Sequence, residues 1–88
     1  MKIIKPSKAG TMESNDIYVM VMPNEEDKIK LELESIVMKQ FGDEIEKVIR
    51  ETLEKLEVKS AIIKAQDKGA LNYTIKSRIE TAVKRASM

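Results

Sequence analysis

The chain contains no cysteine, no histidine and no tryptophan, and aromatic residues make up only 3% of its 88 residues. Without cysteine there can be no disulfide, no thiolate nucleophile and no zinc–thiolate site. Without histidine the chain lacks the side chain whose ordinary pKa suits proton transfer near neutral pH, and which is the usual base of a catalytic serine. No carboxylates or lysines cluster in a way that would replace it. We therefore expect no catalytic residue, no metal site and no enzyme.

Long hydrophobic runs are also missing, and no segment approaches the length of a membrane span. Only two apolar residues stand between Lys2 and Lys5, so the start of the chain has no signal-peptide core and the expected compartment is the cytoplasm. The net charge is +1 although 35% of the residues are charged, whereas a general nucleic-acid binder would be clearly basic. The sequence thus predicts neither a membrane nor a nucleic-acid partner.

Charge is unevenly distributed along the chain. Residues 23–57 contain six bases and eleven acids, a net charge of −5, and residues 58–88 contain seven bases and two acids, a net charge of +5. The simplest interpretation is two solvated helix faces of opposite sign. The alternative is a basic surface for a partner or for cofactor phosphates, with Lys76, Arg78, Lys84 and Arg85 as its candidate residues.

Two segments of the first half are typical of strands. Residues 17–22 are apolar at every position, which favours a central or doubly covered strand. Residues 28–34 alternate between charged and apolar side chains, the period of a half-buried antiparallel strand. A polar segment of hairpin-loop length, residues 23–27, separates them, so we expect a hairpin over residues 17–34.

The second half predicts helices around one more strand. Ser35 would cap a short helix that ends at Phe41, Gly42 would interrupt it, and Asp43 would begin a helix over residues 43–57. A strand over residues 58–66 follows, and Asp67 would cap a second helix. Both helices carry an apolar stripe of helical period, with members Ile45, Val48, Ile49, Thr52, Leu53 and Leu56 in the first and Leu71, Ile75, Ile79, Ala82, Val83 and Ala86 in the second. This order predicts one α+β domain over residues 1–88, a two-layer sandwich of a mainly antiparallel sheet with two helices on one face.

The segment of residues 9–16, Ala-Gly-Thr-Met-Glu-Ser-Asn-Asp, is small and polar, as is typical of a turn or a strand end. It also resembles the attachment segment of the citrate lyase acyl carrier protein family, the gamma subunit of that enzyme. In that family a similar run carries the serine that receives a phosphoribosyl-dephospho-coenzyme A arm, and Ser14 falls on that serine. Residues 39–43, 67–71 and 84–87 resemble segments of the same family in the same order.

The resemblance implies a non-catalytic carrier of acetyl and citryl thioesters. Its cofactor would be 2'-(5''-phosphoribosyl)-3'-dephospho-CoA, held by a phosphodiester on Ser14. The implied partners are the alpha (acyl transferase) and beta (citryl lyase) subunits, a cofactor-attaching transferase and an acetate-activating ligase. The residues that would make the attachment segment recognisable are Gly10, Thr11, Glu13, Asn15 and Asp16. Asn15 stands where glycine is equally expected, and both residue types tolerate a left-handed backbone.

Two alternatives stay open. One is the related carrier subunit of malonate decarboxylase, which uses the same kind of arm, although Glu13 and the block of residues 39–43 favour citrate lyase. The other is a small non-catalytic interaction module in which Ser14 has no function. Ser35 faintly resembles the attachment serine of ordinary acyl carrier proteins, but those are all-helical and strongly acidic, so a helix cap is the simpler role.

Overall fold

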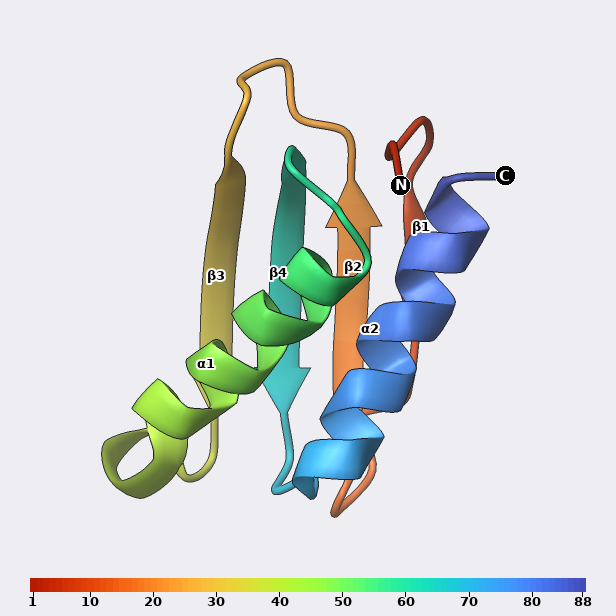
Figure 1. Cartoon of the computed structure of the whole chain (residues 1–88). Helices are drawn as coiled ribbons and strands as arrows, with labels where there is room; N and C mark the ends of the chain where they lie inside the picture. The colour runs from red at the N-terminus through yellow and green to blue at the C-terminus, as the bar shows by residue number, and fades with distance from the viewer.

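The computed structural model describes all 88 residues and has two layers, a four-stranded sheet and two helices that both cover one face of it (Figure 1). The strands are β1 (Ser7–Ala9), β2 (Ile17–Met22), β3 (Ile29–Ser35) and β4 (Ala61–Asp67). The helices are α1 (Met38–Lys55) and α2 (Asn72–Ala86). The predicted α+β sandwich is confirmed. Neither helix is long and apolar enough to cross a membrane.

The order of strands in the sheet is β1-β2-β4-β3, so the predicted hairpin over residues 17–34 is wrong. β4 lies between β2 and β3, antiparallel to the first and parallel to the second. Parallel neighbours need a long crossover, which α1 supplies between β3 and β4. The polar segment before β3 instead passes the beginning of β4, where the Ser60 hydroxyl donates to the carbonyls of Asn24 and Glu26.

The inner face of the sheet explains this order. β4 places Ala61, Ile63 and Ala65 in the core, with at most 2% of each residue exposed. Such a strand has most to gain from a central position, whereas every position of β3 is exposed or half-buried, as suits an edge. β2 pairs on both sides, with β1 and β4, as its apolar composition predicted. The helix stripes pack on this face, and of their predicted members only Leu71 is exposed and Leu56 half-buried.

α1 is one continuous helix from Met38, so the predicted interruption at Gly42 and restart at Asp43 are wrong. Gly42 is buried within the helix, where an added Cβ would lie 3.0 Å from the sulfur of Met38. Glycine in a helix interior costs about 1 kcal/mol relative to alanine, which does not end a helix whose apolar face is well packed.

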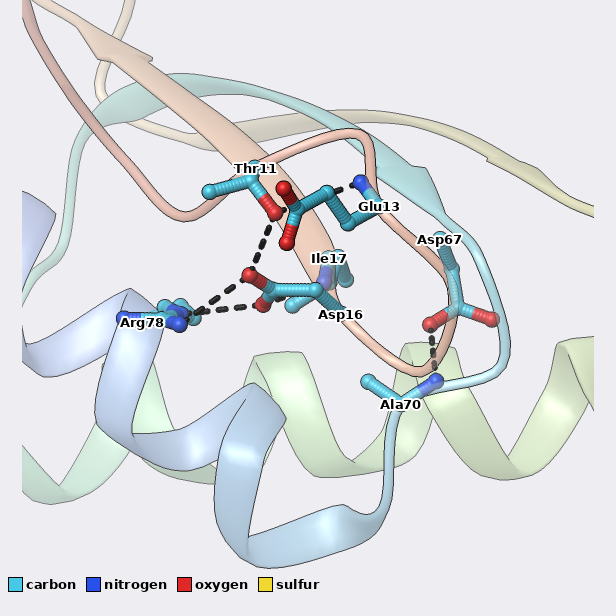
Figure 2. A network of polar contacts seen from close by, with 7 residues as sticks. All are labelled: Thr11, Glu13, Asp16, Ile17, Asp67, Ala70 and Arg78. Atoms are coloured by element: carbon cyan, nitrogen blue, oxygen red, sulfur yellow. Dashed lines mark hydrogen bonds and ion pairs between the residues drawn. The ribbon is translucent and has the colours of Figure 1, made fainter.

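The two predicted helix caps are also wrong, because Ser35 and Asp67 are the last residues of their strands. They bond to each other: the Ser35 hydroxyl donates to Asp67 Oδ2 at 2.7 Å and accepts from the Val37 N–H. The buried Asp67 carboxylate also accepts from the N–H group of Gly69. It accepts from the Ala70 N–H as well (Figure 2). Both polar side chains therefore close the turns after β3 and β4.

Candidate functional site

Residues 10–16, called here the β1–β2 loop, lie at the end of the sheet where β3 and β4 also finish (Figure 1). Two backbone hydrogen bonds fasten the loop to the turn after β4. The Asn15 N–H donates to the Lys68 carbonyl and the Lys68 N–H donates to the Asp16 carbonyl, each at 2.8 Å. These bonds continue the antiparallel pairing of β2 and β4 beyond the strands and fix the second half of the loop.

The buried carboxylate of Asp16 organises the first half of the loop (Figure 2). Nε and Nη2 of Arg78, on α2, each donate to one of its oxygens at 3.0 Å. The Thr11 hydroxyl and the Ile17 N–H also donate to it, both at 2.7 Å. Thr11 in turn accepts from the Glu13 N–H at 3.2 Å. The network therefore links both ends of the loop to the helix layer.

The protonation state of Asp16 follows from these contacts. Burial by itself raises the pKa of the carboxyl, but the hydrogen bonds from Arg78, Thr11 and the Ile17 N–H outweigh it, and the pKa falls to about 2. The carboxylate is therefore charged at any physiological pH.

The loop needs an unusual backbone at two positions. Gly10 has φ +88°, and a Cβ there would lie 1.8 Å from the carbonyl oxygen of Ile17, so only glycine fits. Asn15, next to Ser14, has φ +65°, in the left-handed region that asparagine tolerates better than most residues. These two residues set the turn that carries Ser14.

Ser14 itself is exposed in the turn, outside the packed sheet. The hydroxyls of Ser7, Ser35 and Ser60 donate to acceptors in the protein, whereas no hydrogen bond within the chain involves the hydroxyl of Ser14. An enzyme can therefore reach this oxygen without unfolding the loop. The neighbouring Glu13 is exposed as well.

The structure thus separates the segment singled out in the sequence into two groups. Gly10, Thr11, Asn15 and Asp16 shape and anchor the loop, and Glu13 and Ser14 remain at the surface. Sequence reasoning missed Arg78, which it grouped with the basic residues of a docking surface. The one signal that could have pointed to Arg78 is that a buried carboxylate such as Asp16 needs a cation beside it. Arg85 is also engaged, donating to the Lys8 carbonyl at 2.9 Å, whereas Lys76 and Lys84 are exposed.

The sequence and the fold of the chain both match known proteins. Residues 4–86 match a family model described as malonate decarboxylase delta subunit. The fold matches a chain of the crystal structure of a Pseudomonas malonate decarboxylase hetero-tetramer in complex with malonate, with a TM-score of 0.79 over 98% of this chain and 92% of that one. Sequence identity in that alignment is 16%, so the match shows the fold alone. The family model spans nearly the whole chain, which places the chain among these small acyl carrier proteins.

Closer relatives define the family more narrowly. The chain is 53% identical to the citrate lyase acyl carrier protein of Clostridium perfringens and 51% identical to that of Halothermothrix orenii. Each alignment covers 99% of this chain and 86% and 92% of the respective relative. The counterpart from Treponema denticola is 45% identical over 98% of its own length. The chain belongs to the citrate lyase acyl carrier protein family, and its role is that of an acyl carrier.

Proposed function

We propose that Ser14 is the covalent attachment point of a 2'-(5''-phosphoribosyl)-3'-dephospho-CoA arm and that the chain serves a citrate lyase complex as its non-catalytic carrier subunit. The observation that carries this proposal is the exposed Ser14 hydroxyl on a loop whose backbone is fixed on both sides. The site fits a phosphodiester, because a group added to this oxygen displaces no hydrogen bond of the chain.

The residues of the chain have a positioning task. Asp16, Arg78 and Thr11 hold the loop against α2, so that Ser14 is presented in one geometry to the attaching enzyme. Glu13 is available at the surface for contact with that enzyme. When bound, the arm supplies the thiol on which acetyl and citryl groups are carried as thioesters. A tethered thioester has a high effective concentration at each active site that the arm reaches.

The partners of the proposed complex are an alpha subunit that exchanges acetyl for citryl and a beta subunit that cleaves citryl. A cofactor-attaching transferase and an acetate-activating ligase would load the carrier, in the cytoplasm. Malonate decarboxylase is the second candidate system, favoured by the description of the family model. The relatives with about half of their residues identical are named for citrate lyase, which supports the first system.

Peptide mapping tests the attachment site. Trypsin cleaves after Lys8 and Lys28, and the peptide of residues 9–28 contains Ser14 as its single serine. After co-expression with the attaching enzyme, this peptide should gain the mass of the arm, and fragmentation should assign the gain to Ser14. A gain on another peptide, or none under conditions that load a known citrate lyase carrier, would contradict the proposal.

A further inference from the structure

A groove of about 400 Å³ opens between the first turns of α1 and the turn that precedes α2. Its walls are mainly apolar and are formed by Val37, Phe41, Ile45, Gly69, Ala70 and Leu71, with Glu44 and Asn72 as the polar members. Phe41 and Leu71 are 51% and 61% exposed, so their apolar side chains are open to contact from a bound group. Ile36, also largely exposed, borders the groove, with its Cδ1 atom 3.7 Å from the position of an added Cβ on Gly69.

The groove begins beside Asn15, the residue that follows Ser14. The side-chain oxygen of Asn15 lies 3.9 Å from the position that a Cβ on Gly69 would occupy. Lys68, directly before Gly69, is joined to the loop by the two backbone bonds described above. A group attached to Ser14 therefore starts one residue away from an apolar wall.

We propose that the adenosine part of an arm carried by Ser14 lies in this groove. The inference rests on the proposed function. In 2'-(5''-phosphoribosyl)-3'-dephospho-CoA the phosphoribosyl group is attached to the 2' oxygen of the adenosine, so adenine is the first flat, largely apolar group that follows the serine phosphodiester. A groove beside the anchor is where such a group can lie.

The wall residues suit adenine in shape and in hydrogen bonding. Phe41 and Leu71 offer apolar and aromatic contact to the faces of the base. The Glu44 carboxylate can accept from the exocyclic amine, and the Asn72 amide can donate to a ring nitrogen. The volume is within the range of about 300–1,000 Å³ that small-molecule sites occupy. Lys68 is bonded through its backbone to Asn15 and Asp16, next to the anchor, and its ammonium forms no ion pair in the chain that would keep it from the phosphodiester.

An exposed apolar groove could be occupied by the adenosine of the arm or by a second protein. The covalent tether favours the adenosine. A short flexible tether holds a group at an effective concentration of the order of millimolar, so even weak contacts with the groove become populated. With adenosine held there, the pantetheine portion and its thiol project from one edge of the carrier. The groove would thus fix the direction in which the reactive end of the arm leaves the protein.

NMR of loaded and unloaded protein tests the inference. Intact mass first establishes that the sample is loaded, so a failure of attachment is distinguished from a failure of docking. In the loaded protein we expect nuclear Overhauser contacts from the adenine H2 and H8 protons to the side chains of Phe41 and Leu71. Amide shift changes should extend from the β1–β2 loop into the first turns of α1 and α2.

Matched variants complete the test. Leu71→Ser should weaken docking about tenfold, the loss of one well-packed apolar contact. Tyr73→Ser is the control, because Tyr73 is 72% exposed two residues away and does not line the groove. Both side chains are exposed, so both variants should fold, which the amide spectrum of the unloaded form checks. A loaded protein whose shift changes stop at the loop, or whose groove responds only to protein concentration as in self-association, would overturn the proposal.

Discussion

Arg78, in the middle of α2, donates one hydrogen bond to each carboxylate oxygen of Asp16, the residue that directly precedes β2. The two residues are 62 positions apart in the sequence. A two-point arginine–carboxylate contact fixes orientation as well as distance. The geometry of the loop that carries Ser14 therefore depends on a residue far outside the loop itself.

Replacement of Arg78 should loosen this loop. Arg78→Lys keeps the charge but cannot make the two parallel hydrogen bonds, and Arg78→Met leaves the buried Asp16 without a cation. We expect losses of about 1–3 kcal/mol in unfolding free energy, larger for methionine. Urea melts measure them, with Lys76→Met on the exposed side of the same helix as the control. Equal effects at positions 76 and 78 would contradict the role of the ion pair.

Stability should fall in acid because of the same pair. The pKa of Asp16 is about 2 in the folded protein, below the value of about 3.9 in an unfolded chain. A lowered pKa stabilises the folded state fully above the unfolded value, and this contribution disappears as the pH falls from about 4 to about 2. Melts across this range should show a smaller decline for Asp16→Asn than for the parent chain. Parallel declines in the two proteins would show that other carboxylates account for the acid sensitivity.

The buried face of α1 gives a third prediction. Leu53 is 1% exposed, and Leu53→Ala should cost about 2–5 kcal/mol. Glu54, one position on, is exposed, and Glu54→Ala should cost less than about 0.5 kcal/mol. Denaturant melts of the two variants compare the faces directly, and similar losses would show that the helix packs differently.

Much of the fold could be predicted from the sequence, because the regular spacing of apolar residues can be recognised within each single helix or strand. The stripes of both helices and the alternation in β3 place the correct residues toward the core. The strand order could not be predicted in this way. A polar segment between two strand-like runs favours a hairpin locally, and only the better burial of β4 displaces β3 to the edge.

The candidate site is likewise divided into features that the local sequence predicts and features that depend on contacts between distant residues. The exposed turn around Ser14 could be predicted from eight consecutive residues, and so could the tolerance of Asn15 for the left-handed backbone that it adopts. Arg78 could not, because no spacing rule connects a residue of α2 with a carboxylate at the start of β2. The capping roles that the sequence predicts for Ser35 and Asp67 are wrong for a similar reason, because their mutual hydrogen bond joins two strands that are paired only in the folded sheet.

Intact mass after co-expression with the attaching enzyme tests the central claim most directly. Ser14→Ala removes one oxygen from an exposed turn, so it should change stability by no more than about 0.5 kcal/mol. Ser77→Ala on the surface of α2 is the matched control, preferable to Ser35→Ala, which would also remove the hydrogen bond to Asp67. We predict that the parent chain and Ser77→Ala gain one arm each and that Ser14→Ala, although folded, gains none. A mass gain that persists in Ser14→Ala would contradict the assignment.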